Sequence, residues 1–313
     1  MKPYGIHADF RFCRVCLPFT AAVLRLSSPV QRLLLRLTPL PNGISVRRSR
    51  IPGYRGLPVT VSVLTPSGCG EQPPCLLYLH GGGFGFRAAR YQKKLVCRYA
   101  LGAGCRVVLP DYHLLPRHPW PAAQEDCFAV YRWLLRGAEA PPVDEKGIAV
   151  GGDSAGGALA ALLGGMADRA DLPLPCMQML IYPVTDAEMK TDSMARFPDT
   201  PLWNAVQNAR MWNMYLGDAD LAARHAASPM QAALPRQIPA AYVETAEFDC
   251  LHDEGLNYAD RLRKAGGRVT LRETTGTIHG YDIVAGSEIV KESVRARIAA
   301  LRRAFCGEEG RAD

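Results

Sequence analysis

The sequence predicts an α/β fold in which a mostly parallel sheet is covered by helices on both faces. From residue 58 onward, short stretches of strand character alternate with longer helical patterns, the order that produces such a sheet. Residues 185–235 break this alternation and are rich in Trp, Met and Phe, so we expect an inserted helical segment there. With 313 residues, 48% hydrophobic and 21% charged, the chain is long enough for one large core with such an accessory element.

The expected strands are short runs rich in apolar and β-branched residues. The first alternates between apolar and polar residues, and the second is a continuous apolar run that ends at a glycine cluster. In order, the strands are expected at residues 59–63, 76–79, 106–109, 148–150, 177–181, 241–244 and 269–272. The helices between and after them are expected at residues 88–100, 122–135, 155–170, 253–264 and 288–305.

Residues 24–37 form an amphipathic pattern in which Arg25, Arg32 and Arg36 stand among leucines, with Pro29 in the middle. We expect a helix here that is broken at the proline. A membrane-surface helix is one interpretation of its basic face, and a packing helix over an apolar cleft is the one we favour. No stretch reaches the ~18 uninterrupted apolar residues of a membrane span, so no stable membrane insertion is expected.

The formal net charge of +7 raises the question of nucleic-acid binding. The basic residues gather mainly at the two ends of the chain, without interleaved aromatic residues or a nucleic-acid module, so we expect no nucleic-acid partner. An apolar run at 15–26 is interrupted by Pro18 and lacks a cleavage site for a signal peptide. The ten cysteines are scattered, and the CxxC at 13–16 has no second pair at zinc spacing. These features predict a cytoplasmic protein without a metal site or a disulfide framework.

A G-x-S-x-G motif, residues 152–156, directly follows the strand expected at 148–150 and opens the helix expected at 155–170. This motif places a serine on a strained strand-to-helix turn, where side chains in place of the glycines would clash. The helix N-terminus also favours negative charge that develops near the serine. The motif therefore predicts Ser154 as a nucleophile.

The four residues from His80 to Gly83 close the strand expected at 76–79. A triple glycine leaves backbone N–H groups free to approach an oxyanion, and HGGG is typical of the oxyanion loop of lipases and esterases. A flexible glycine loop is the alternative, but it does not explain a histidine immediately after a buried strand.

Two later strand ends are followed by Asp249 and His279. The chain order serine, acid, histidine is that of α/β-hydrolases and differs from the order in other serine-hydrolase folds. Asp253 and Glu254 compete for the acid position, but they fall at the start of the next expected helix, where carboxylates favour the helix dipole and capping explains them better. We therefore predict a triad of Ser154, His279 and Asp249.

At these motifs the chain resembles the hormone-sensitive-lipase-like branch of the α/β-hydrolases, the esterase family with HGGG and GDSAGG. The resemblance covers nearly everything from residue 75 onward, including residues 111–121, 152–157, 211–217, 228–229 and 249–255. The family's DYRLAPEHP loop differs here, because His113 and Arg117 replace its Arg and Glu. The first fifty residues match the family poorly.

The resemblance implies an α/β-hydrolase fold with a mostly parallel eight-stranded sheet and a helical cap. It divides the chain into N-terminal cap helices, a first core part, a cap insertion and a second core part, at 1–45, 46–184, 185–235 and 236–313. It implies Ser154 as nucleophile, His279 as base and Asp249 as the acid that orients the base. It also implies an oxyanion hole made by the backbone N–H groups of Gly82, Gly83 and Ala155.

The expected function is hydrolysis of small, short-acyl carboxylic esters by a serine carboxylesterase that needs no metal or cofactor. An acyltransferase or amidase with the same triad stays open, as does a non-hydrolytic small-molecule binder on the same scaffold, although no triad member is lost. A homodimer is also left open. Several apolar residues are candidates either for the acyl or alcohol pocket or for the core of the cap: Phe84, Phe197, Trp203, Met211, Trp212, Met214 and Tyr215.

Overall fold

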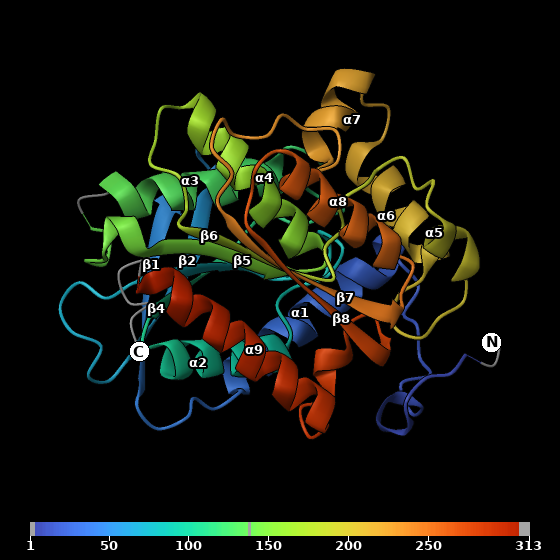
Figure 1. The fold of residues 1–313 in the computed structure, drawn as a ribbon, viewed down its shortest axis with the longest axis horizontal. Coiled ribbons are helices and arrows are strands. Elements are labelled where there is room, and N and C mark those ends of the chain that lie inside the picture. The colour runs from blue at the N-terminus through green and yellow to red at the C-terminus, as the bar shows by residue number, and fades with distance from the viewer. Residues whose placement is uncertain (1–3, 137–138, 307–313) are drawn as a thin grey trace.

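The structure, a computed structural model, describes residues 4–136 and 139–306 and is built around one eight-stranded sheet (Figure 1). The strands are Ile44–Pro52 (β1), Pro58–Pro66 (β2), Cys75–Leu79 (β3), Arg106–Asp111 (β4), Ile148–Asp153 (β5), Met177–Ile181 (β6), Ala240–Phe248 (β7) and Val269–Ile278 (β8). They lie in the order β1-β2-β4-β3-β5-β6-β7-β8. β2 pairs antiparallel with β1 and β4, and the other neighbouring strands run parallel. The predicted fold class is thus confirmed.

Helices cover both faces of this sheet. The core helices are Arg90–Ala103 (α2), Ala122–Arg136 (α3), Ala155–Arg169 (α4), His252–Lys264 (α8) and Glu288–Phe305 (α9). α2 and α9 pack together below the sheet as drawn in Figure 1, and α3, α4 and α8 lie above it. Because both faces are covered, β3 and β6 are buried at every residue. Short 3-10 turns lie at Ala8–Phe10, Tyr54–Gly56, Glu145–Gly147 and Tyr281–Ile283.

The first strand is the one that the sequence pattern does not reveal. β1 lies at the edge of the sheet, pairs with β2 alone, and carries the exposed residues Arg47, Arg48 and Arg50. Exposed charges are common on edge strands, since these bury little surface and must not pair with other chains. A strand of this kind lacks the apolar signal by which the other seven are recognised.

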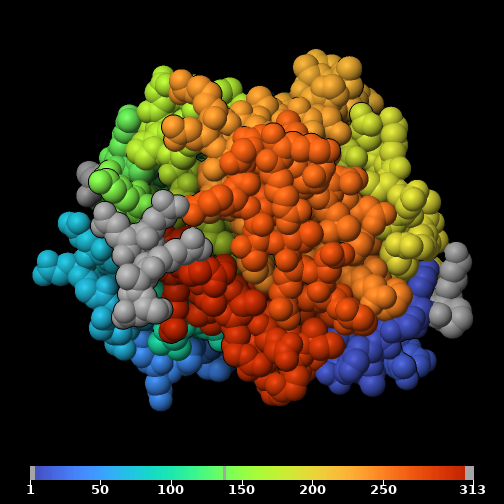
Figure 2. Space-filling model, viewed as in Figure 1, coloured from blue at the N-terminus to red at the C-terminus, as the bar shows by residue number. Residues whose placement is uncertain are grey.

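The remaining helices lie within the two segments predicted to form the cap. They are Ala21–Leu37 (α1), Asp192–Arg196 (α5), Ala205–Leu216 (α6) and Leu221–Ala227 (α7). The two segments contact each other: Phe19 N–H donates to Gln207 Oε1 at 2.7 Å, and Tyr4 Oη donates to Asp199 Oδ1 at 2.5 Å. In Figure 2, α7 projects at the top of the molecule. The yellow part of the insertion lies on the right, directly above the blue N-terminal segment.

α1 differs from expectation at Pro29, because the helix runs through the proline without a break. A proline inside a helix removes one N–H donor and leaves the carbonyl four residues earlier, that of Arg25, without its helical partner. Pro29 and Arg25 are both exposed, so water can satisfy that carbonyl. This solvent access explains why the helix tolerates the proline.

Candidate active site

Ser154 occupies the sharp turn between β5 and α4, with a φ of 56° that is rare for a residue with a side chain. The turn depends on two glycines. A Cβ on Gly152 would lie 2.4 Å from the carbonyl oxygen of Leu79, and one on Gly156 would lie 1.9 Å from the same atom. The strand, turn and helix therefore pack too closely for any side chain at these two positions, as the G-x-S-x-G pattern predicts.

The three residues of the predicted triad lie in one hydrogen-bonded chain. His279 Nε2 is 2.9 Å from Ser154 Oγ, and His279 Nδ1 is 2.7 Å from Asp249 Oδ2. The other Asp249 oxygen accepts a bond from the backbone N–H of Leu251 at 3.0 Å, which fixes the carboxylate. Asp249 is fully buried, and His279 is 6% exposed. This geometry suits a base that removes a proton from the serine while a carboxylate holds its tautomer.

The predicted oxyanion donors lie on two elements beside the serine. Gly82 and Gly83 have φ angles of 123° and 60°, and the Gly82 carbonyl accepts bonds from Gly85 and Phe86 in a tight turn. Ala155 is the first residue of α4, where an N–H has no partner within the helix. Within residues 4–136 and 139–306, the N–H groups of Gly82, Gly83 and Ala155 have no acceptor. They are free to donate to a substrate oxygen.

Asp153 is a site residue that the sequence analysis did not identify. Its Oδ1 accepts bonds from the Gly81 N–H at 3.0 Å and from Tyr78 Oη at 2.8 Å, and its Oδ2 accepts one from Gln92 Nε2 at 2.7 Å. The carboxylate of the residue before Ser154 thereby holds the glycine loop at 81–83 in place. The GDSAGG motif contains this aspartate, but the motif alone does not reveal its distant partners.

A pocket of about 250 Å³ opens at Ser154 and His279. Of the candidate pocket residues, Trp203 lines it. Phe84 does not line it and instead stacks on Tyr215, with ring centroids 3.9 Å apart. Like Phe84, the other candidates do not line the pocket. They belong to the main hydrophobic core or, in the case of Met214, pack against it: Phe197, Met211, Trp212, Met214 and Tyr215. For these residues the structure favours the core alternative over the pocket alternative.

Other pocket residues come from segments that the sequence does not connect to the triad. Val15 and Leu17 come from the N-terminal segment, and Gln31 comes from α1. Tyr182 also lines the pocket and directly follows β6. Its position at a strand end is a signal that could have identified it. The N-terminal residues have no such signal.

Asp253 and Glu254 lie in the first turn of α8, as expected, but their carboxylates bind outside that helix. Asp253 Oδ2 accepts the N–H of Ser193 at 2.7 Å, and Glu254 Oε1 accepts the N–H of Thr185 at 2.6 Å. Both residues thus attach the cap insertion to α8, and this corrects their explanation as helix caps. Neither contacts His279.

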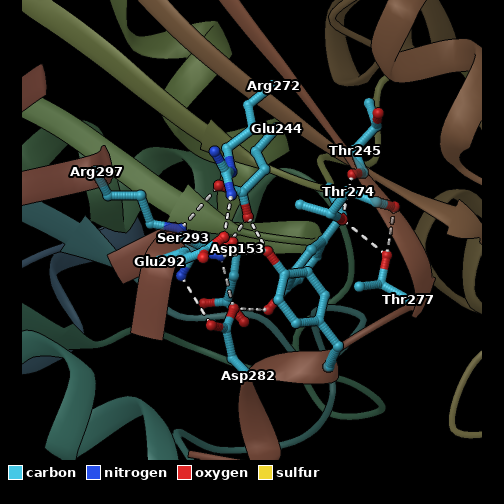
Figure 3. A network of polar contacts seen from close by, with 12 residues as sticks. Asp153, Glu244, Thr245, Arg272, Thr274, Thr277, Asp282, Glu292, Ser293 and Arg297 are labelled. Atoms are coloured by element: carbon cyan, nitrogen blue, oxygen red, sulfur yellow. Dashed lines mark hydrogen bonds and ion pairs between the residues drawn. The ribbon is translucent and has the colours of Figure 1, made fainter. Parts of the chain in front are cut away.

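A second buried polar cluster is centred on Arg297 (Figure 3). Arg297 of α9 binds Glu244 of β7 and donates to Asp282 Oδ1 at 2.9 Å, and all three side chains are fully buried. Tyr182 connects the two clusters: its Oη donates to Asp282 Oδ2 at 2.6 Å, and its ring centroid lies 4.9 Å from that of His279. His279 therefore packs against a tyrosine whose hydroxyl is held by this buried cluster.

The comparisons with known proteins agree with this fold. A family model described as "alpha/beta hydrolase fold" matches residues 76–283. The chain belongs to this family. It is 34% identical to the esterase LipI of Mycobacterium tuberculosis over 249 residues, which cover 78% of each protein. It is also 34% identical to the ethyl acetate hydrolase of Pseudomonas putida, over 70% of this chain and 68% of that protein.

Solved structures extend the likeness to almost the whole chain. The structure matches a bacterial heroin esterase with a TM-score of 0.86 and 30% identity, over 96% of this chain and 98% of that one. Within the described ranges, no three His, Cys, Asp or Glu residues are grouped so that they could hold a metal ion. In the same part of the chain, no helix has the length and apolar character to cross a membrane.

Proposed function

We propose that this carboxylic ester hydrolase is a serine esterase in which Ser154 is the nucleophile, His279 the general base and Asp249 the residue that orients the base. The observation that carries the proposal is the chain of contacts at 2.9 and 2.7 Å from serine to histidine to aspartate, beside a pocket. The names of its esterase and ethyl acetate hydrolase relatives support the same chemistry.

In the proposed reaction, His279 takes the proton of Ser154 as the serine oxygen attacks the ester carbonyl. The N–H groups of Gly82, Gly83 and Ala155 stabilise the oxyanion of the tetrahedral intermediate; one such donor is typically worth about 100- to 1000-fold in rate. His279 then protonates the departing alcohol. Water repeats these steps on the acyl-enzyme and releases the acid.

Small, short-acyl esters are the proposed substrates. A pocket of about 250 Å³, with Trp203 and Tyr182 in its wall, supports small substrates over long triglyceride chains. All ten cysteines are free, which supports our proposal of a reducing, cytoplasmic location.

The test is hydrolysis of p-nitrophenyl esters from acetyl to palmitoyl by the wild type and by Ser154→Ala. We expect a rate that peaks at short acyl chains and falls by about 10⁴-fold or more in the variant. Ser45→Ala, at an exposed serine of β1, is the matched control and keeps full activity.

Full activity of Ser154→Ala would overturn the assignment of the nucleophile. If the folded wild type cleaves no ester, product analysis with competing alcohols and with anilides separates a transferase or an amidase from a binding protein.

A further inference from the structure

α1 presents its apolar side to solvent. Leu26, Val30, Leu33, Leu34 and Leu37 are spaced by three or four residues and share one face, which we call the outer stripe. Their side chains are 75%, 55%, 56%, 40% and 68% exposed. A helix that packs on a core normally shows the opposite arrangement, with its apolar stripe turned inward.

The side of α1 that faces the protein is held mainly by polar contacts. Ser28 Oγ accepts a bond from Arg87 Nε at 2.8 Å, and Gln31 Oε1 accepts one from the Arg87 N–H at 2.9 Å. Lys93 Nζ donates to the Leu35 carbonyl at 3.2 Å. Leu24 is the buried residue of the helix. α1 thus packs on the protein through Leu24 and polar groups, and its attachment does not use the outer stripe.

Positive charge accompanies the outer stripe. Arg25, Arg32 and Arg36 are exposed, and α1 contains no acidic residue. Arg32 and Arg36 also line a cavity of about 650 Å³ between α1, α2 and the sheet, together with Arg48 and Lys93. Among the described residues, none of these four arginines has an ion-pair partner. Asp111 also lines this cavity, but it pairs with Arg87. Burial, and to a smaller extent the charge of Arg48, lower the pKa of Lys93.

The mouth of the catalytic pocket adjoins this helix. Gln31 of α1 lines the pocket, and so do Val15, Leu17 and Ile283. The last three side chains are 68%, 53% and 48% exposed, so the pocket opens through an apolar rim. Exposed apolar groups around a pocket next to an exposed apolar helix face indicate an interaction surface.

We propose that the outer stripe and the arginines of α1 bind the surface of a membrane that contains anionic phospholipids, with the pocket mouth turned toward it. An amphipathic helix with basic residues lies in the interface plane, its apolar side in the acyl boundary and its cations at the lipid phosphates. A second copy of this chain fits less well, because pairing two α1 helices would bring their arginines together without a carboxylate to offset them. The inference goes beyond the proposed function and does not depend on ester hydrolysis.

The test is flotation of the intact protein with phosphatidylcholine vesicles, with and without phosphatidylglycerol. We expect the protein to float with the anionic vesicles and to be released by salt. In the double variant Leu33→Glu/Leu37→Glu, the affinity for the anionic vesicles falls by at least about tenfold per leucine, because the new side chains do not insert among the acyl chains. Leu221→Glu is the matched control, because Leu221 is 67% exposed on α7, and it floats like the wild type.

A second pair of variants tests the electrostatic contribution of the α1 arginines to vesicle binding. Arg32→Gln/Arg36→Gln weakens binding to the anionic vesicles by about fivefold per arginine. Arg98→Gln/Arg303→Gln, at exposed arginines of α2 and α9, leaves binding unchanged. A direct measurement uses Leu33→Trp, whose fluorescence shifts to the blue with anionic vesicles and is quenched by brominated lipids.

Any one of the following outcomes would overturn the proposal. The wild type does not float at low salt, or Leu33→Glu/Leu37→Glu floats like the wild type, or the fluorescence of the Leu33→Trp variant does not respond to vesicles. Light scattering that shows a dimer, converted to a monomer by Leu33→Glu/Leu37→Glu, would assign the surface to a second copy instead. Thermal unfolding of each variant confirms that it is folded, and Leu33→Trp keeps the question decidable if the glutamates disturb the helix.

Discussion

Two buried polar clusters are joined by Tyr182, and their hydrogen-bonding groups are satisfied to different degrees. In the cluster around Arg297, the guanidinium binds both Glu244 and Asp282, and tyrosine hydroxyls donate to both carboxylates. In the triad, Asp249 is equally buried, but the chain of bonds ends at Ser154 Oγ, which faces a pocket.

This difference in hydrogen bonding explains how one edge of the sheet supplies both stability and reactivity. Burial opposes the ionisation of Glu244, but the charge of Arg297 and the hydrogen bonds outweigh it, so the pKa of Glu244 lies below its usual value. For Asp282 burial prevails, and its pKa is raised. In the Arg297 cluster every polar group has a partner, so this cluster stabilises the fold and offers no free group to a substrate. Where donors are left unpaired beside a pocket, as at Gly82 and Gly83, a reacting group can use them.

The same substitution made in each cluster tests most directly whether the triad serves catalysis and the Arg297 cluster serves stability. We expect Asp249→Asn to lower kcat by about 10⁴-fold with little change in melting temperature, because the histidine loses its orienting carboxylate. Asp282→Asn, the matched variant, should instead lower the melting temperature and affect kcat far less. Steady-state kinetics on p-nitrophenyl butyrate and thermal unfolding measure both. An Asp249→Asn variant with the wild-type rate would contradict the role given to this residue.

The second prediction removes the cation from the closed cluster. Arg297→Met leaves Glu244 and Asp282 buried without their cation and should lower the free energy of unfolding by about 3–5 kcal/mol. Urea unfolding measures this change. Arg303→Met, at an exposed position of the same helix, is the control and should change stability by less than about 0.5 kcal/mol. Equal stabilities of the two variants would show that the cluster does not stabilise the fold.

The third prediction tests the unpaired donors. A Cβ at Gly83 would lie 2.8 Å from Phe19 and 2.9 Å from Trp203, so Gly83→Ala must shift the loop. We expect a loss of about 100-fold in kcat from the displaced N–H. Gly68 also has a positive φ but has open space around it, so Gly68→Ala shows the effect of backbone strain alone. If both variants keep the wild-type kcat, the oxyanion hole is not at this loop.

The smallest expected effect concerns Glu254, a buried carboxyl without a cation beside it. Burial raises its pKa well above the usual value, and its Oε2 has no partner in the part of the chain that the structure describes. The unfolded chain loses this proton near pH ~4.3 while the folded chain keeps it, so the group's contribution to stability falls as the pH rises from there to the folded pKa.

Glu254→Gln does not titrate. The free energy of unfolding of Glu254→Gln, minus that of the wild type, should therefore increase as the pH rises above about 4.3. Urea unfolding across this range measures the difference. A difference that stays constant or decreases with pH would mean that Glu254 is ionised in the folded protein.

Features that depend on residues close together in the chain could be predicted from the sequence. A strand, a glycine turn and a helix at 148–170 identify the turn at Ser154, because the requirement for glycine at 152 and 156 arises from close local packing. The order of Ser154, Asp249 and His279 then predicts a triad, which the tertiary structure brings within hydrogen-bond distance. The seven strands with apolar patterns follow from the same local periodicity, whereas the edge strand β1 lacks that signal.

Contacts between side chains that are distant in the sequence could be seen in the tertiary structure alone. Trp203 and Trp212 are large apolar residues of the same insertion and both belong to the core, but Trp203 also lines the pocket and Trp212 does not. Arg297 reaches Glu244 from a position 53 residues away, and no spacing rule connects the two. The outward direction of the leucines of α1 was decided in the same way. An amphipathic pattern shows that a helix has an apolar side, but only packing decides whether that side meets the protein or its surroundings.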